Sequence, residues 1–205
     1  MSKYMQSTII KRFLLLSAIC FSALTISQAV AQNDYMKAVA RYKNIKQAAA
    51  NVTKKQHKKS LKKDIVTTGG AFIMHPDMIS ISTNEGLDKL VMKGTKFTMT
   101  VNGKEHTTDS RKNPQFAAFH DVLTSIINGG TTDITKRSDV SIQKTGTSLS
   151  ISVIPTAGND KKKKRVMFSK FVLVIDMNTS AMKLLRMVER DGNFTDYEFS
   201  KFVFE

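Results

Sequence analysis

Residues Gly69–Asp109 read GGAFIMHPDMISISTNEGLDKLVMKGTKFTMTVNGKEHTTD and carry the strongest structural signal in the chain. Short segments of alternating apolar residues are separated by turn residues, among them Gly94 and the pair Asn102-Gly103. Within Lys96–Val101 successive side chains point to opposite faces, so one face is apolar and the other carries threonines. The stretch predicts an antiparallel meander whose apolar face packs on protein or holds a ligand.

The first 31 residues have the features of a secretory signal peptide. Basic residues precede the apolar run Phe13–Ile26, and Ala29-Val30-Ala31 fits a cleavage site with small residues. The run is short for an uncleaved anchor, which needs about 20 residues. We expect cleavage after Ala31, which leaves residues 32–205 as a single domain in the periplasm.

Composition limits the chemistry of the exported part. Cys20 is the one cysteine of the sequence and lies in the leader, so residues 32–205 have no thiol chemistry and no disulfide. Without the three basic residues of the leader, 29 basic and 17 acidic residues remain, a net charge of +12. Export argues against a nucleic-acid partner, which leaves an anionic membrane surface, an acidic protein or simply solvated lysines.

Two amphipathic helices are predicted. Apolar residues recur at three- and four-residue spacing in Asn33–Val52, which predicts a helix that packs on a core, with a helix on a membrane surface as the alternative. A second helix, Phe116–Asn128, follows Pro114 and ends at Gly129-Gly130. It has the most hydrophobic face of any predicted helix and needs an apolar surface opposite it.

Strands are predicted on both sides of the second helix. They cover Ile65–Met74, Met78–Thr83, Leu87–Met92, Lys96–Val101 and Lys104–Asp109, and then Ser148–Ile154, Val166–Ile175, Ala181–Glu189 and Phe194–Phe204. Gly69-Gly70 predicts a bulge or a sharp bend. Phe171–Ile175 is apolar at every position, which predicts a strand covered on both faces. Thr131–Asp139 is expected to add a short turn of helix. This order of elements is typical of an antiparallel α+β domain.

Sequence motifs for catalysis are lacking. None of the four histidines has metal-ligand spacing, and His120, beside Phe119 on the predicted helix, fits a core or boundary histidine. Neither glycine pair forms a phosphate-binding loop, and there is no nucleophile-elbow pattern. We expect a protein that is not an enzyme and has no cofactor and no metal. A hydrolase built from distant residues stays an alternative.

The order and spacing of these elements resemble the LolA-like family of periplasmic outer-membrane lipoprotein carriers. The similarity spans Ile65–Phe204 and rests on the stretch Gly70–Pro76 (GAFIMHP), the helix Phe116–Asn128, the strand ending in Pro155 and the last hairpin. The resemblance implies an α+β fold, an incomplete, strongly curved antiparallel β-barrel (half-barrel) with helices forming a lid over a hydrophobic cavity.

The function that the resemblance implies is carriage of acylated lipoproteins. Such a carrier receives them from an inner-membrane lipoprotein-releasing transporter and passes them to an outer-membrane acceptor; we expect it to be a monomer. An acyl chain of about sixteen carbons has about 13 kcal/mol of transfer free energy at stake, so it needs a dry slot to cross water. Alternatives are a carrier or sensor of other lipids with the same fold, a small exported hydrolase, and a basic envelope-binding module.

The predicted lining of the cavity comes from the meander and the second helix. Nine of the eleven methionines lie in residues 32–205, and their flexible side chains suit a slot for irregular chains as well as an ordinary core. The candidate lining residues are Phe72, Met74, Ile79, Ile81, Leu90, Met92, Phe97, Met99, Phe116, Phe119, Leu123 and Ile126.

Two further positions follow from the resemblance and the charge pattern. His75 precedes the strand-ending Pro76, where family members often have an arginine that ties the lid to the barrel. Its imidazole predicts a weaker, pH-sensitive lid clasp, or else an ordinary surface histidine. The run Lys161–Arg165 fits a solvated loop that could also dock an anionic headgroup or an acidic transporter surface.

Overall fold

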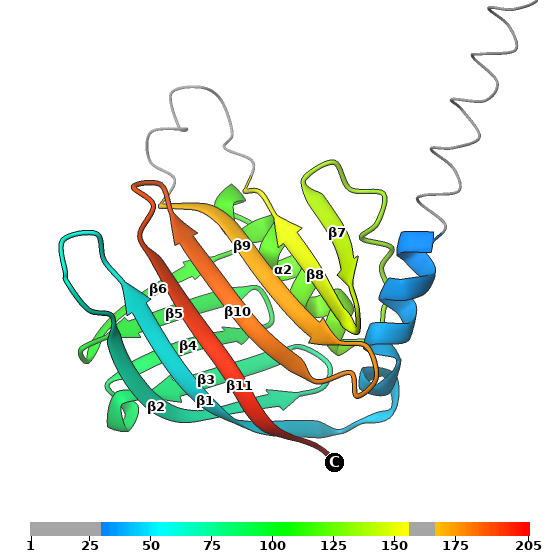
Figure 1. Ribbon diagram of the computed structural model, residues 1–205, viewed down its shortest axis with the longest axis horizontal. Coiled ribbons are helices and arrows are strands. Elements are labelled where there is room, and N and C mark those ends of the chain that lie inside the picture. Colours follow the sequence, from blue (N-terminus) through cyan, green and yellow to red (C-terminus); the bar gives the residue numbers. More distant parts are fainter. Residues whose placement is uncertain (1–29, 156–166) are drawn as a thin grey trace, which may run out of the picture.

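The computed structural model describes residues 30–155 and 167–205. Its strands form one antiparallel sheet in the order β6-β5-β4-β3-β2-β1-β11-β10-β9-β8-β7, so the first and last strands pair at the centre. The sheet curves around the helix α2, and its edge strands β6 and β7 are not paired with each other (Figure 1). This is the predicted half-barrel, and the fold class is confirmed.

The bounds of the elements place most strands where the sequence predicts them. Residues 30–39 are helical and continue into a 3-10 helix, η1. The elements are η1 Ala40–Asn44, β1 Gln47–His57, β2 Ile65–Met74, β3 Met78–Thr83, η2 Asn84–Gly86, β4 Asp88–Lys93, β5 Lys96–Val101, β6 Lys104–Asp109, α2 Pro114–Ile127, β7 Val140–Thr145, β8 Ser148–Val153, β9 Phe168–Asp176, β10 Met182–Glu189 and β11 Phe194–Phe204. The bounds of β2, β3, β5, β6 and β11 are those predicted, and turn residues mark the start of β11 and both ends of most of the others.

The predicted helix Asn33–Val52 is wrong in its second half. Helical structure ends with η1, and residues 47–52 belong to β1, which pairs with β2 on one side and β11 on the other. Ala48, Ala50 and Val52 are buried at every second position, which is the period of a strand. Two full ladders of backbone hydrogen bonds outweigh the helical preference of the alanines.

Three smaller predictions are also wrong. Residues 131–139 contain no helix, and the next element is β7, which the sequence did not indicate. Gly69 and Gly70 pair regularly with both neighbouring strands, so the predicted bulge does not lie there. A bulge lies instead in β11, where Lys201 and Phe202 stand opposite Ala50 of β1. Gly69 is needed for close approach, since an added Cβ would lie 1.9 Å from the carbonyl oxygen of Ser82. Strand β9 is fully buried on one face only.

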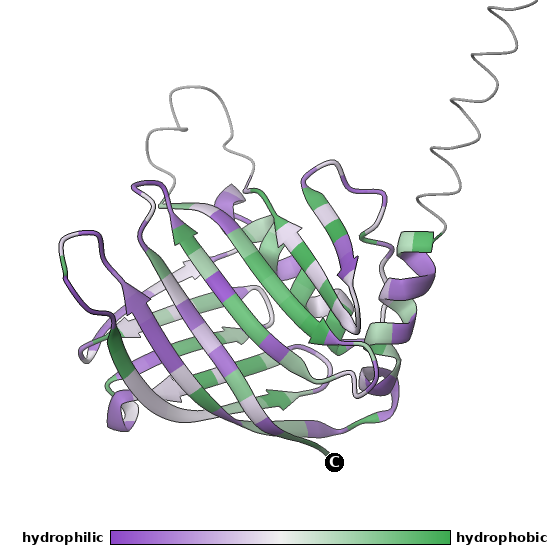
Figure 2. Cartoon of the chain, in the orientation of Figure 1, coloured by the Kyte–Doolittle hydropathy of each residue, from purple (hydrophilic) through white to green (hydrophobic). Residues whose placement is uncertain are grey.

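The core lies between the concave face of the sheet and α2. Hydrophilic and hydrophobic residues alternate along β10 and β11 (Figure 2). Inside the sheet, the ring of Phe119 stacks on Phe171 of β9 with 4.2 Å between centroids, and Phe116 stacks on Phe97 of β5 at 4.4 Å. Helix α2 therefore joins the two halves of the sheet through aromatic contacts.

The N-terminal helix covers the C-terminal end of α2. The hydroxyl of Ser125 donates to the carbonyl oxygen of Thr132 at 2.6 Å, so the hydroxyl of Tyr35 donates to Ser125 at 2.7 Å. Burial raises the pKa of Tyr35 to about 12. After α2, Gly129 adopts φ +64°, and an added Cβ would lie 2.8 Å from the backbone nitrogen of Lys43. Only glycine allows both this backbone conformation and this approach.

We expect the substitution Gly129→Ala to destabilise the protein by about 3 kcal/mol, because it combines a left-handed backbone with a collision against the backbone of η1. Gly103 is the matched control. It has φ +78° but no atom within 4 Å of an added Cβ, so Gly103→Ala should cost only about 1 kcal/mol. Urea unfolding of both variants measures the difference, and equal costs would show that η1 does not restrain this turn.

Candidate functional site

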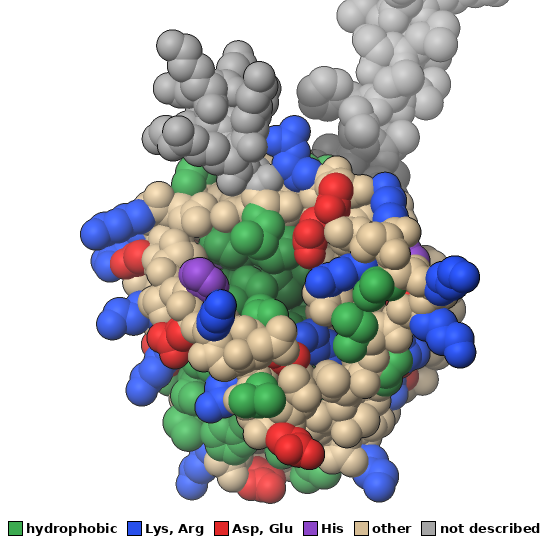
Figure 3. All heavy atoms as spheres, turned by 90° about the vertical axis from the view of Figure 1, so that its left-hand side faces the viewer, with side chains coloured by type: hydrophobic (Ala, Val, Ile, Leu, Met, Phe, Trp, Pro, Cys, Tyr) green, Lys and Arg blue, Asp and Glu red, His purple; other side chains and the backbone are tan. Residues whose placement is uncertain are grey.

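The concave side of the sheet has an open groove at its mouth. One pocket of about 210 Å³ lies between β4–β5 and the strands β9–β11, and most of its accessible surface is apolar. Its apolar side chains come from both halves of the sheet and are Met99, Val101, Met167, Phe168 and Met187. Figure 3 shows a hollow of this kind, with apolar side chains at its base and charged side chains around its rim.

A second pocket of about 210 Å³ extends the first toward the start of α2. Met99, His106 and Met167 line both pockets, so the two meet at these side chains. Phe97, Phe116 and the polar residues Asn113 and Gln115 complete the second pocket. We call the two pockets together the groove. It is long, mostly apolar and open to solvent, the form of a site for a flexible apolar ligand.

One wall of the groove contains a buried ion pair. Lys54 of β1 points into the concave side, and its Nζ lies 2.8 Å from Oδ2 of Asp88 on β4. Each side chain is about nine-tenths buried, with 9% and 10% of its surface exposed. Burial alone would raise the pKa of Asp88, but hydrogen bonds from Lys54 and from the backbone N–H of Asn102 outweigh it and lower the pKa. The pair places an ammonium group beside the apolar lining.

Helix α2 is fixed to both halves of the sheet near the groove. His120 donates from Nε2 to the carbonyl oxygen of Gly94 at 2.9 Å, in the turn between β4 and β5. Gln115 accepts a hydrogen bond of 2.9 Å from the backbone N–H of Met167, just before β9. His120 thus has the structural role predicted for it, and the start of α2 is held in place where it borders the groove.

The structure divides the predicted lining residues into three sets. Phe97, Met99 and Phe116 lie in the groove. Seven others are buried between the sheet and α2 and line neither pocket of the groove: Ile79, Ile81, Leu90, Met92, Phe119, Leu123 and Ile126. A ligand-binding role for these seven stays a prediction.

The assignment of Phe72 and Met74 to the inner face is wrong. In β2 the buried, inward residues are Ala71 and Ile73, so Phe72 and Met74 lie on the outer face, and Met74 is 43% exposed. Strand β2 takes this orientation from β1, whose inward alanines Ala48 and Ala50 pair with Ile73 and Ala71.

His75 does not clasp the helix. Its side chain is exposed and makes no hydrogen bond to the part of the chain that the structure describes, while its backbone N–H donates to the carbonyl oxygen of Lys46 at 3.0 Å. The contact between this corner and α2 is made by Asn128, whose Nδ2 donates to the carbonyl oxygen of Pro76 at 2.8 Å. Of the two interpretations of His75, the clasp is therefore wrong, and the structure agrees with an ordinary surface histidine.

Sequence reasoning missed most of the groove. Lys54 follows the end of the predicted helix and was assigned to no strand. No local sequence pattern predicts that a lysine side chain points into the concave side of a sheet. Met187 and Phe168 were assigned to strands but not to a site. Apolar and polar residues alternate around these two positions, which indicates the face of the strand that points inward. The alternation does not indicate which part of that inner face is covered by α2 and which part lines a pocket.

Other predictions fall on residues outside this description. The run Lys161–Arg165 and nearly all of the predicted signal peptide lie outside the described ranges, and cleavage after Ala31 stays a prediction. Within residues 30–155 and 167–205, no group of three or more acidic, histidine or cysteine side chains is arranged to hold a metal ion. Over the same ranges, none of the helices has the length and hydrophobicity required to span a bilayer.

The ion pair in the groove wall yields a stability prediction. Lys54→Met leaves the carboxylate of Asp88 buried without its partner, and we expect a loss of about 3 kcal/mol in the free energy of unfolding. The double variant Lys54→Met/Asp88→Asn removes both charges and should recover most of that loss. Chemical unfolding at pH 7 tests this, and a single variant no less stable than the double would contradict it.

The same pair predicts a dependence of stability on pH. Because the pKa of Asp88 is lower in the folded protein than in the unfolded chain, its contribution is present above the unfolded value of about 4. The contribution is lost as the pH falls through the lower folded pKa. The wild type should therefore lose stability relative to the double variant as the pH falls below about 4, measured by urea unfolding at stepped pH.

Comparisons with known proteins find similarity in solved structures. No protein-family model matches the sequence, and no curated protein matches it either. A LolA superfamily protein from Nitrosomonas europaea matches at 10% identity and a TM-score of 0.37, covering 85% of this chain and 93% of its own. A putative outer membrane lipoprotein-sorting protein domain from Vibrio parahaemolyticus matches at 10% and 0.42, covering 87% and 93%.

A third match is the lipoprotein LppX of Mycobacterium tuberculosis, at 13% identity and a TM-score of 0.40, covering 85% of this chain and 95% of its own.

Proposed function

We propose that the protein is a carrier that binds the acyl chains of a lipoprotein or another lipid in the groove and shields them from water. The observation that supports this most directly is the groove itself, an open, mostly apolar channel of two adjoining pockets. Each methylene moved from water into such a site contributes about 0.8 kcal/mol, so a channel that accepts part of a chain already binds usefully.

The lining suits a ligand that must enter and leave. Met99, Met167 and Met187 contribute flexible thioether side chains, which adapt to chains of different shape. The groove is also open to solvent, so a chain can enter it while a bulky polar head remains in water. A carrier between two membranes needs this combination of sufficient affinity and easy release.

The specific route is part of the proposal. We propose that the protein works in the periplasm, receives acylated lipoproteins from an inner-membrane transporter and delivers them to an outer-membrane acceptor, as the resemblance implies. We further propose that it does this as a binding protein without catalysing a reaction. Carriage or sensing of a different lipid would use the same groove and is the second candidate.

A charged side chain in the groove should weaken acyl-chain binding. We expect Met99→Glu to weaken binding of a fluorescent fatty acyl probe by at least tenfold, because the carboxylate must be desolvated by the bound chain. Val91→Glu is the matched control, since Val91 is half-buried on the outer face of the neighbouring strand β4. Titration of the probe, with thermal unfolding to verify folding, measures both variants.

Two results would contradict the proposal. One is a wild-type protein that does not bind acyl probes, and the other is an equal loss of binding in Met99→Glu and Val91→Glu. Mass spectrometry of organic extracts of the purified protein then separates the candidates, since acylated peptide supports lipoprotein carriage and phospholipid supports carriage of another lipid. Turnover of a substrate would instead favour the alternative of a small hydrolase.

A further inference from the structure

The loop between β1 and β2 combines lysines with exposed apolar side chains. Residues 58–64 read KKSLKKD, so four of seven are lysines, and the loop continues into the first two residues of β2. The exposed apolar residues of this segment are Leu61, Ile65 and Val66, at 43%, 46% and 55% exposure. A surface that contacts only solvent rarely exposes basic and apolar residues together within one short segment.

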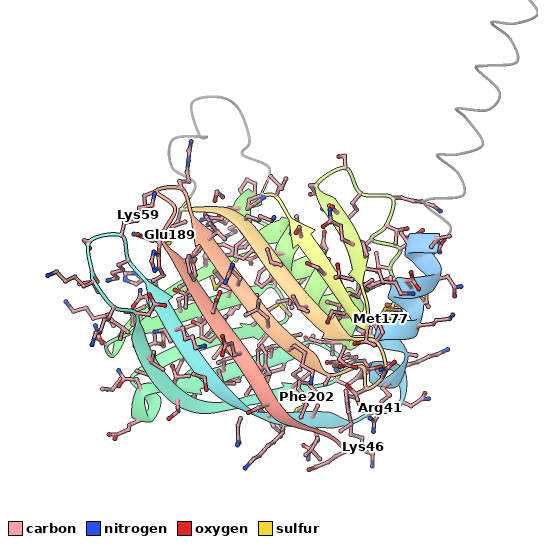
Figure 4. The ribbon with its side chains drawn as sticks, viewed as in Figure 1. Arg41, Lys46, Lys59, Met177, Glu189 and Phe202 are labelled. Atoms are coloured by element: carbon pink, nitrogen blue, oxygen red, sulfur yellow. The ribbon has the colours of Figure 1, made fainter. Side chains whose placement is uncertain are left out.

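The loop has a fixed position. The backbone N–H of Lys59 donates to Oδ1 of Asn193 at 3.0 Å, and its Nζ donates to the carbonyl oxygen of Asp191. At the base of the loop the ring of His57 stacks on Phe194 with 4.7 Å between centroids. Figure 4 shows Lys59 and Glu189 at the same end of the sheet, far from Lys46. The loop is therefore attached to the turn between β10 and β11.

The positive charge of the loop is not neutralised locally. Asp64, the one acidic residue of the loop, lies 2.9 Å from Nδ1 of His57. Within the described ranges no carboxylate forms an ion pair with Lys58, Lys62 or Lys63. The loop therefore presents its charge to a partner from outside the chain.

The loop begins at the rim of the groove. Gln56 of β1 lines the groove, pairs with the groove residue Thr195 of β11, and stands two residues before the loop. On its other side Gln56 pairs with Ile65, one of the exposed apolar residues. A surface that contacts the loop would thus face the opening of the groove.

We propose that the β1–β2 loop docks the protein on an anionic lipid surface. Lysines within a Debye length of such a surface are attracted to its headgroups, and apolar side chains beside them enter the headgroup boundary. Leu61 and Val66 supply the apolar contact, and Lys58, Lys62 and Lys63 supply the charge. Docking in this way brings the groove to the surface from which, or to which, an acyl chain moves. The surface is separate from the groove and does not depend on which ligand the groove takes.

The test is cosedimentation of the purified protein with lipid vesicles. We expect binding to vesicles of phosphatidylcholine with about 30% phosphatidylglycerol, an anionic fraction of physiological order, and little binding to phosphatidylcholine alone. The triple variant Lys58→Gln/Lys62→Gln/Lys63→Gln should bind about 100-fold more weakly, since each lysine near the surface contributes about fivefold. Leu61→Ser should weaken binding about fivefold by removing the apolar contact.

A matched control removes the same charge elsewhere. Lys37, Lys43 and Lys46 are exposed on the N-terminal helix, η1 and the segment just before β1, at the opposite end of the molecule. Their triple glutamine variant should bind the vesicles within about threefold of the wild type. The run Lys161–Arg165 is unchanged in both triple variants, so its charge cancels in the comparison.

Three outcomes would overturn the proposal: no binding of the wild type to anionic vesicles, an unaffected loop variant, or equal losses in the two triple variants. The first would favour an acidic protein as partner of the loop, and the last would indicate diffuse attraction by net charge. Binding of the fluorescent acyl probe is measured on the same proteins and should not change in the loop variant. If the wild type binds the acyl probe but not the vesicles, the docking inference alone is overturned. If the wild type does not bind the acyl probe, the carrier function is overturned.

Discussion

The contact that the rest of the structure depends on is the insertion of α2 between the two halves of the sheet. The edge strands β6 and β7 are not hydrogen-bonded to each other, so no backbone ladder closes the curve. The rings of Phe116 and Phe119 close it instead, stacking on Phe97 from one half and Phe171 from the other. Packing between side chains does not require the fixed strand register that a ladder of backbone hydrogen bonds requires. Closure by side chains therefore leaves the mouth of the half-barrel open.

The groove follows from where α2 stops filling the sheet. Along most of its length the helix buries its apolar face completely against the concave side. The first turn of the helix, at Gln115 and Phe116, lies at the mouth of the half-barrel. Beyond this turn, Met99 from one half of the sheet and Met187 from the other line the same pocket, and no residue of α2 lies between them. The same sheet face is thus solid core at one end and accessible lining at the other. Alternation along a strand marks both parts identically, because it reports only which face is covered.

Charge is distributed around this opening in two different ways. Inside, Lys54 is paired with Asp88 and its charge is used within the fold. Outside, the lysines of the β1–β2 loop have no carboxylate partner among the described residues, and exposed apolar side chains lie beside them. The buried pair contributes to the geometry of the groove wall, whereas the loop is available to a partner. A net positive charge in the sequence does not distinguish these two uses, since it counts every lysine alike.

The sequence by itself determined the strands of the meander, because turn residues and alternation are local, and five strands have the bounds predicted from it. It also determined the amphipathic helix α2 and the antiparallel α+β class, and the family resemblance added the half-barrel. The tertiary structure decided the orientation of β2: its partner β1 reads as a helix in isolation, and only the pairing of Ala48 and Ala50 with β2 turns Ile73 inward and Phe72 outward. It also replaced His75 by Asn128 at the clasp and brought Met99 and Met187 together from opposite halves of the chain. These features depend on contacts between residues far apart in sequence, which local patterns do not record.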